Sequence, residues 1–421
     1  MIKNSYPNIK RASMLVGVDF GDERIDIETS GAEVLGVWTG PERVPREMIA
    51  DQIRSGLDDP RGYPALKLAV VPGDRVALAV DHRLGEVSDF LAEIVRILKR
   101  AGVEPASIRV VVPAQPRFSI EEIKASGIVL EIHDPDDPST LAYLASTEQG
   151  RRIYLNKSLV DADFTMAIGA VSHDAIFGLK GPWSVLFPGL SDRETIRSFA
   201  AHAREHEHDL AEPGRELVES FEVGKLLGCY LHMGIVEGIA GPARVLVGDC
   251  ASVHASGSQA FDAAWTFRIA EPAEIVVAGI GGVDEPNRNR RDPAGIAEFA
   301  DALDSARRIV RRGGRIVILS HVNGPIGPAV QKLVEMGDDR SRTKLAREHA
   351  DLVDFIEARK IAAALAWADV FVFSRLDHDL LDDLSIIPLD KPEQARKLVA
   401  ASRTCAFLGR AERTRGEISL T

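Results

Sequence analysis

The order of apolar and polar positions along the chain predicts an α/β protein. From residue 67 onward, aliphatic and β-branched runs alternate with amphipathic segments, which is typical of βαβ units around a parallel sheet. Residues 75–80 are expected to form a buried strand, and the apolar residues within 88–102 recur as on one face of a helix. Further strands are predicted over 107–114 and 163–171.

A second α/β block begins near residue 270. A strand over 274–282, a helix over 295–314 and a strand over 315–320 repeat the earlier order. The same pattern continues with a helix over 351–366, a strand over 369–374 and a helix over 392–402. Gly, Pro and Ser interrupt the periodicity between 240 and 270. We therefore predict an N-terminal α/β domain over 1–260 and a C-terminal α/β domain over 261–421, with a small antiparallel element in the first fifty residues.

Composition and charge narrow the function classes. The 421 residues are 45% apolar, which is enough for globular cores and excludes a disordered chain. The net charge of −12 argues against nonspecific binding to nucleic acid or to an anionic membrane. No apolar run reaches the length of about 20 residues that spans a bilayer, and the N-terminus lacks a signal-peptide core. We expect a soluble, cytoplasmic protein.

The three cysteines carry no recognisable site. Cys229, Cys250 and Cys405 are widely spaced and form no CxxC pair, which excludes a disulfide framework or a structural zinc cluster. We expect them to be small hydrophobic residues of the core.

Polar loops follow three of the predicted strands in the first block. They are Asp81-His82-Arg83, Gln115-Pro116-Arg117 and Ser172-His173-Asp174. Any one of them is more often a helix cap or a solvated loop than a site. Because parallel strands end at one edge of a sheet, the three together favour a ligand site there. Arginine suits a carboxylate, and histidine can move a proton near neutral pH.

A glycine-rich segment over 169–196 is the most distinctive part of the chain. Its glycines would let backbone N–H groups approach a phosphate, with Lys180 as the countercharge. It does not match the P-loop, and Gly279-Ile-Gly281 does not complete a dinucleotide motif because Asp284 replaces the last glycine.

Two histidines downstream, His202 and His206, have the i, i+4 spacing of a helical metal site. A solvated helix face explains the pair equally well. We keep one of them, His202, as a candidate metal ligand.

The order of these pieces resembles the nickel-pincer nucleotide lactate racemase family over most of the chain. The matching segments are VALAVDHRLGEVSDFLAEIVRILKRAGV, IEEI, Ile132-His133-Asp134, LAYLASTEQGRRIYLNKSLVDADFTMAIGAVSHD, GLKGPWSVLFPGLSDRETI, EIVVAGIGG and ALDSARRIVRRGGRIVILS. The resemblance implies two α/β domains with mainly parallel sheets and an active-site cleft between them. It also implies a pyridinium mononucleotide whose sulfur arms hold nickel, with a histidine as the remaining ligand.

The chemistry implied by the resemblance is a reversible hydride transfer. The cofactor takes a hydride from the α-carbon of a 2-hydroxy acid, and the resulting 2-keto acid receives it back on the other face. One histidine on each side moves the hydroxyl proton.

Some of the family's catalytic residues have a counterpart in this sequence and others do not. Asp81 and Arg83 match the family's Asp and Arg, although the family has one more residue between them. His173 matches one proton-transferring histidine. Gln115 stands where the other belongs, and its amide can hydrogen-bond a hydroxyl but cannot accept its proton.

The cofactor residues also depart from the family pattern. Ser184 stands where the family has a lysine that anchors the cofactor covalently, and Lys180 is either a relocated anchor or a phosphate partner. Gly178, Gly181 and Trp183 complete the predicted cofactor loop. His202 lies two residues beyond the expected nickel ligand, where Ala200 stands.

The predicted substrate residues of the second domain are altered in charge. Glu298 and Asp301 replace a family Gln and Lys, and two acids would repel a simple carboxylate. Arg288 and Arg290, with Arg291, can supply positive charge just before them. A solvated loop explains these arginines equally well.

The leading hypothesis is an isomerase: a divergent racemase or epimerase that binds the nickel-pincer nucleotide noncovalently and acts on a 2-hydroxy acid larger or more polar than lactate. It would depend on cofactor-biosynthesis enzymes as partners. Two alternatives remain open at this point. One is a one-sided, oxidoreductase-like or dehydratase-like enzyme that uses only His173. The other is a noncatalytic carrier or sensor of a nucleotide or hydroxy acid. The sequence leaves the oligomeric state open.

Overall fold

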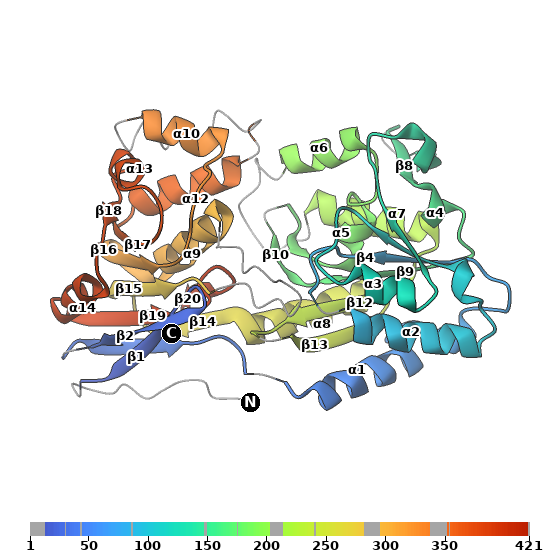
Figure 1. Cartoon of the computed structure of the whole chain (residues 1–421), viewed down its shortest axis with the longest axis horizontal. Coiled ribbons are helices and arrows are strands. Elements are labelled where there is room, and N and C mark those ends of the chain that lie inside the picture. Colours follow the sequence, from blue (N-terminus) through green and yellow to red (C-terminus); the bar gives the residue numbers. More distant parts are fainter. Residues whose placement is uncertain are drawn as a thin grey trace. The chain divides into compact units, whose positions relative to one another are not determined.

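The computed structural model describes residues 13–421, except for residues 30, 43, 86, 147–149, 175, 203–213, 240, 282–294, 337–351, 353 and 420–421 and the side chains of 200–202. The chain divides into two compact units (Figure 1). The N-terminal unit spans Pro41–Ala264. The C-terminal unit combines the segment up to Gly40 with the described chain from Trp265 onward.

The N-terminal unit is built on a six-stranded sheet of order β13-β12-β9-β4-β5-β6. Its strands are β4 (Val76–Val80), β5 (Ile108–Val112), β6 (Val129–Ile132), β9 (Phe164–Ala170), β12 (Leu231–Glu237) and β13 (Pro242–Gly248). All neighbours are parallel except β12 and β13. The carboxyl ends of β4, β5, β9 and β12 therefore meet at one edge.

Alternation along β4 explains how the helices cover this sheet. Val76, Leu78 and Val80 share a core cluster with the apolar faces of α1 (Arg46–Asp58) and α2 (Ser88–Arg100). Ala77 and Ala79 face the opposite side and pack near α4 (Lys157–Val160) and α5 (Pro182–Leu186). The small alanine side chains allow these short helices to lie close to the sheet.

Further elements of the N-terminal unit lie on both sides of the sheet. They are the helices α3 (Ile120–Ala125), α6 (Arg193–His202), α7 (Arg215–Leu227) and α8 (Cys250–Trp265), the hairpins β7 (Leu141–Ser146) with β8 (Arg152–Asn156) and β10 (Ser172–Asp174) with β11 (Gly178–Lys180), and the 3-10 turns Leu66–Leu68, Pro105–Ser107 and Pro138–Thr140.

The expected capping box of α3 is partly present, since the Ser119 hydroxyl accepts a hydrogen bond from the backbone N–H of Glu122 at 3.3 Å.

The C-terminal unit holds a second six-stranded sheet, of order β18-β17-β16-β15-β19-β3. Its strands are all parallel: β3 (Glu33–Trp38), β15 (Ala273–Gly279), β16 (Val310–Leu319), β17 (Asp369–Phe373), β18 (Ile387–Pro388) and β19 (Thr404–Leu408). A separate parallel pair joins β14 (Thr266–Ile269) to β20 (Arg415–Ile418). The α/β class with mainly parallel sheets, as expected from the sequence, is confirmed.

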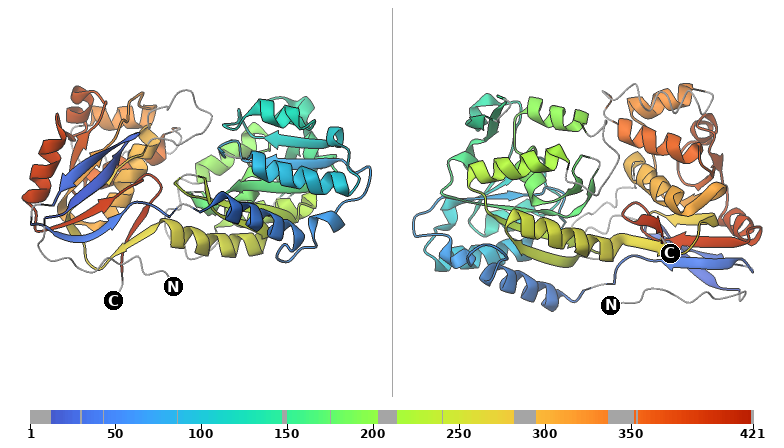
Figure 2. Two further views of the ribbon diagram at one scale, coloured as in Figure 1. Left: turned by 60° about the horizontal axis from the view of Figure 1, so that its bottom comes forward. Right: turned by 180° about the vertical axis from the view of Figure 1, so that it is seen from behind.

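Both faces of this second sheet are covered, as buried parallel strands require. Helices α9 (Ile296–Ile309), α10 (Pro328–Glu335) and α12 (Phe355–Leu365) cover one face. The antiparallel hairpin β1 (Leu15–Phe20) with β2 (Glu23–Glu28) and helix α14 (Pro392–Ala400) cover the other (Figure 2). The short helix α13 (His378–Asp383) precedes β18.

Two expectations differ from the structure. Only β1 and β2 form the predicted antiparallel element, because β3 pairs parallel with β19 nearly 370 residues later, and the segment up to Gly40 belongs with the C-terminal residues. The helix expected over 295–314 ends at Ile309, and β16 begins at Val310. Gly313 there adopts φ +69°, a conformation that favours glycine, so these glycines serve an irregular strand rather than a helix stop.

The cysteines lie as expected: Cys229 and Cys405 are buried and Cys250 is partly buried. Among the helices of the described chain, none is long and apolar enough to cross a membrane.

A buried histidine on β12 predicts a pH-dependent stability. His232 is 1% exposed, and burial lowers the pKa of its imidazole to about 4 from 6.5. The stability linked to this group is present above pH 6.5 and is lost as the pH falls toward 4, because the unfolded chain then binds a proton that the folded one rejects. The shift corresponds to about 3 kcal/mol.

Urea unfolding at pH 7 and pH 4 measures this effect. The wild type should lose about 3 kcal/mol more than His232→Gln between the two pH values. The matched control His378→Gln, at an exposed position, should keep the wild-type dependence. Equal pH dependence in wild type and His232→Gln would contradict the assignment.

Candidate active site

A buried ion pair stands at the carboxyl end of β4. The Asp81 side chain is 2% exposed, and its carboxylate accepts hydrogen bonds from Arg83 Nε at 3.0 Å and Nη2 at 3.1 Å. The backbone N–H of Arg83 donates to the same carboxylate at 3.0 Å. Burial alone would raise the pKa of Asp81, but the charge and hydrogen bonds of Arg83 outweigh it and lower that pKa. The carboxylate is therefore ionised at neutral pH and holds the guanidinium in place.

Lys180 brings a second cation toward this pair. It ends β11, opposite Ser172 in the β10–β11 hairpin. Burial lowers the pKa of its amine, as does the neighbouring charge of Arg83, whereas Asp174, Asp81 and Glu237 oppose the shift. Asp174 and Glu237 also act electrostatically on Arg83.

We call Asp81, Arg83, Asp174, Lys180 and Glu237 the charge cluster. Its members come from the ends of β4, β10, β11 and β12, so the sheet edge assembles residues that lie up to 156 positions apart. With three carboxylates and two cations, the cluster would bind an anionic group only where that group replaces a carboxylate as the partner of Arg83 or Lys180.

His173 occupies the middle of β10. Strand alternation places it with Leu179 on one face of the hairpin, whereas Asp174 and Lys180 lie on the other. Its Nδ1 lies 3.3 Å from the carbonyl oxygen of Gly178, and its ring meets Phe261 edge-on at 4.8 Å. Because a carbonyl only accepts, Nδ1 carries the proton in the neutral ring, which leaves the lone pair on Nε2. This tautomer is suited to accept a proton.

Gln115 is exposed in the loop that follows β5. That loop is tied to the loop after β4, since the backbone N–H of Arg117 donates to the carbonyl oxygen of His82 at 2.7 Å. The structure thus brings together two of the three polar loops that the sequence singled out.

The predicted cofactor loop is tightly packed. Trp183 is fully buried against Phe221 and His254, with ring centroids at 5.4 and 5.2 Å. The Ser184 hydroxyl donates to the carbonyl oxygen of Gly181 at 2.8 Å, within the first turn of α5. Gly178 adopts φ +70°, which few other residues tolerate.

Gly181 has a packing reason to be glycine. A Cβ at this position would lie 2.4 Å from the Trp183 ring. The buried ring cannot move away, so Gly181→Ala should destabilise the protein by about 1–3 kcal/mol. Chemical unfolding without cofactor measures this loss. Gly224→Ala in α7 is the control, because its Cβ would meet only ordinary contacts at 3.6 Å and the variant should be neutral or more stable. Unchanged stability of Gly181→Ala would contradict the packing role.

The predicted residues of the C-terminal unit have partners within that unit. Glu298 accepts a hydrogen bond from the backbone N–H of Gly295 at 2.9 Å, as the third residue of α9. Asp301 pairs with Lys360 of α12 at 2.5 Å. Arg288, Arg290 and Arg291 lie outside the described residues. Their role in substrate binding stays a prediction.

The predicted metal ligand is only partly described. His202 is the last residue of α6, its side chain is outside the description, and His206 lies beyond it. Within the described part of the chain, no group of three or more His, Cys, Asp or Glu side chains is arranged to hold a metal ion.

Sequence reasoning did not select three residues near this edge. Asp174 and His82 were seen only as loop residues, and Glu237 was missed together with its strand. The signal for Glu237 is the apolar run over 231–236, which ends on this acid.

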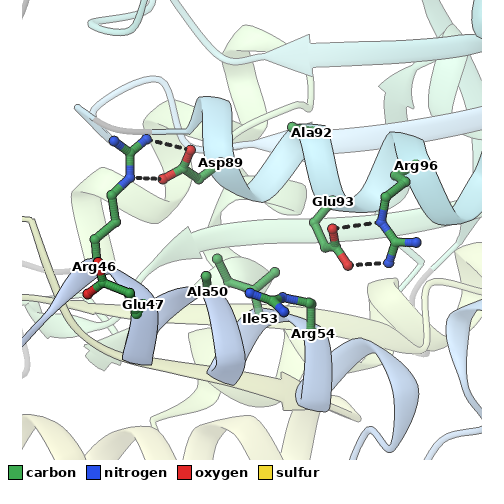
Figure 3. Close-up of a pocket in the computed structure, with 9 residues that line it drawn as sticks. All are labelled: Arg46, Glu47, Ala50, Ile53, Arg54, Asp89, Ala92, Glu93 and Arg96. Atoms are coloured by element: carbon green, nitrogen blue, oxygen red, sulfur yellow. Dashed lines mark hydrogen bonds and ion pairs between the residues drawn. The ribbon is translucent and has the colours of Figure 1, made fainter.

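A groove between α1 and α2 lies in the same unit (Figure 3). Arg46 donates to Asp89 through Nε and Nη2, both at 2.8 Å, and Arg96 Nε donates to Glu93 at 2.8 Å. These guanidinium groups already face carboxylates within the groove.

The fold and site define a class of protein: two α/β units with mainly parallel sheets, one of which carries charged side chains at its carboxyl edge. Residues 20–211 match the family described as the lactate racemase N-terminal domain. Asp81, Arg83, His173 and Lys180 all lie within this range. This match confirms the resemblance found in the sequence.

Solved structures show that the likeness in fold extends over nearly the whole chain. The lactate racemase apoprotein from Thermoanaerobacterium thermosaccharolyticum aligns with a TM-score of 0.73 and 17% identity, over 96% of this chain and 100% of that one. A protein from Thermotoga maritima aligns with a TM-score of 0.58 and 13% identity, over 91% and 100%. No curated protein sequence matches the chain.

Proposed function

We propose that this protein is a nickel-pincer nucleotide-dependent racemase or epimerase of a 2-hydroxy acid. The reaction is a reversible hydride transfer through a 2-keto intermediate. The observation that carries the proposal is the charge cluster, of which all members except Glu237 lie within the segment that matches the lactate racemase N-terminal domain. A cytoplasmic location and dependence on cofactor-biosynthesis enzymes belong to the same proposal.

The residues at the sheet edge fit the anionic part of such a cofactor or substrate. Lys180 is partly buried, Arg83 is held by the Asp81 carboxylate, and Gly178 adopts φ +70° in the same short strand as Lys180. We assign Lys180, with Gly178, to the cofactor phosphate in a noncovalent complex. His202 is the candidate nickel ligand, and Gly181, Trp183 and Ser184 support the loop.

The proposed roles follow from the chemistry of each side chain. When bound, the cofactor accepts a hydride from the substrate α-carbon and returns it. Arg83, held by Asp81, would pair with the substrate carboxylate. His173 would accept the hydroxyl proton on Nε2 and return it, while its Nδ1–H remains on the Gly178 carbonyl. Gln115 would hydrogen-bond the substrate hydroxyl or carbonyl.

A label experiment tests the proposal. The protein would be produced together with the enzymes that make the cofactor and given D and L forms of lactate, malate and 2-hydroxyglutarate labelled with deuterium at the α-carbon. A racemase should invert the configuration, retain most of the deuterium and release little keto acid. Loss of the label to solvent, or no inversion by nickel-loaded protein, would contradict the proposal.

Gln115 favours a second candidate, a one-sided enzyme that uses only His173. An amide cannot accept a proton at neutral pH. The substrate would therefore be oxidised to the keto acid, and no hydride would be returned to the opposite face of the keto acid. This enzyme would accumulate 2-keto acid in the same assay, in proportion to an added electron acceptor.

A further inference from the structure

We propose that His82 is the second proton-transferring residue of this site, in the role that Gln115 cannot fill. The inference rests on the proposed racemase function. It follows from the position of one imidazole beside the charge cluster.

The surroundings of His82 distinguish it from an ordinary loop histidine. Its side chain is 27% exposed, yet its Nδ1 is buried and has no hydrogen-bond partner. The nearest carboxylate oxygen, Asp81 Oδ1, lies 3.8 Å away, which is too far for a hydrogen bond. That carboxylate already accepts three bonds from Arg83. A buried ring nitrogen without a partner is unfavourable, so its retention needs a reason.

The charges around His82 keep it neutral before reaction. Burial lowers the pKa of the imidazole below 6.5, and the positive charges of Arg83, Arg117 and Lys180 act in the same direction. Only Asp81 opposes them. At pH 7 the ring therefore offers a lone pair, and once it is protonated the Asp81 carboxylate stabilises the imidazolium from 3.8 Å.

Two imidazoles from different elements meet the requirement of racemisation. His82 belongs to the loop after β4 and His173 to β10, and the proposal assigns one imidazole to each face of the planar keto acid. The O–H proton passes to an imidazole nitrogen as the O–H electron pair forms the C=O bond. When bound, the nickel-pincer nucleotide would supply the acceptor for the α-hydrogen and its electron pair. Return of the hydride to the other face takes a proton from the second imidazole, which must therefore begin the turnover protonated while the first is neutral. Each turnover exchanges the protonation states of the two rings, and the reverse reaction exchanges them back.

Activity of His82 variants is the first test. With the D and L forms of lactate, malate and 2-hydroxyglutarate, His82→Gln should lower racemisation at least about 100-fold, with nickel content and melting temperature unchanged. His82→Ala should recover part of the rate when imidazole is added. The wild-type kcat/KM should fall below pH 6.5 as the ring is protonated, and that limb should disappear from the residual rate of His82→Gln. His378→Gln is the matched control.

Histidine NMR of the protein without cofactor is the second test and needs no turnover. The His82 signal, assigned by its absence in His82→Gln, should titrate below pH 6.5. Its pKa should rise in Lys180→Met, because a neighbouring positive charge is removed. An unchanged titration would place the ring outside the influence of the cluster and overturn the inference.

The outcomes distinguish a failure of the His82 assignment from a failure of the proposed racemase function. An active wild type whose His82→Gln variant keeps its rate within threefold overturns the inference alone. A nickel-loaded wild type that inverts none of the six probe acids overturns the proposed function, and the role of His82 falls with it.

Discussion

Replacing His173 by alanine should lower the rate of racemisation at least about 100-fold. Because the His173 Nδ1–H donates a hydrogen bond to the carbonyl oxygen of Gly178, Nε2 is the proton acceptor of the ring. Alanine has no group that can replace the imidazole. General acid and base groups contribute about 10²–10⁴ in rate, so the loss should appear in kcat rather than in KM. Steady-state kinetics with the substrate identified among the labelled acids measure it.

Two controls give this result its meaning. His378→Ala, at an exposed position of α13, should keep the wild-type rate. Nickel content of His173→Ala should equal that of the wild type, because the residue is assigned to proton transfer and not to cofactor binding. A His173→Ala variant that still inverts its substrate at the wild-type rate would remove His173 from the mechanism.

Replacing Arg83 by leucine should cause the largest loss of stability among substitutions at the site. The Asp81 side chain is 2% exposed, and without Arg83 its carboxylate would remain buried with no bidentate partner. Breaking such a pair costs about 3 kcal/mol at the lower end of the usual range, which is appropriate because the Arg83 side chain is 42% exposed. Urea unfolding at pH 7 measures the loss.

An exposed pair in the same unit provides the control. Arg75 and Asp163 make a similar contact at 3.0 Å, but their side chains are 63% and 44% exposed. Arg75→Leu should therefore change stability much less than Arg83→Leu does, because both partners are exposed to water. The double variant Asp81→Asn with Arg83→Leu should recover part of the loss, because no buried charge remains. Equal losses in Arg83→Leu and Arg75→Leu would contradict the buried-pair assignment.

Local periodicity predicted much of the fold because it reports burial directly. The helix expected over 88–102 is α2, and its apolar residues Phe90, Leu91, Ile94 and Leu98 are all buried. Pairings between distant segments leave no such pattern. Nothing in residues 33–38 indicates that β3 joins β19, because the parallel register depends on both strands and on the sheet between them.

The site was predictable to the extent that its residues follow recognisable strands. Asp81 and Arg83 come directly after a buried run, and the structure joins them in one ion pair. Glu237 was missed because the strand before it was missed. The different surroundings of His173 and Lys180 depend on the β10–β11 hairpin, whose three-residue strands are too short to show alternation in the sequence.

The central claim is that this chain binds a nickel-pincer nucleotide, and a native mass spectrum combined with metal analysis tests it most directly. The protein would be made alongside the cofactor-biosynthesis enzymes and measured under native and denaturing conditions. We predict one nickel per chain and an added mass that is lost on denaturation, because the family resemblance places Ser184 where the anchoring lysine would stand and we assign Lys180 to a phosphate. A chain without nickel and without added mass, purified from cells that load a control lactate racemase, would contradict the account.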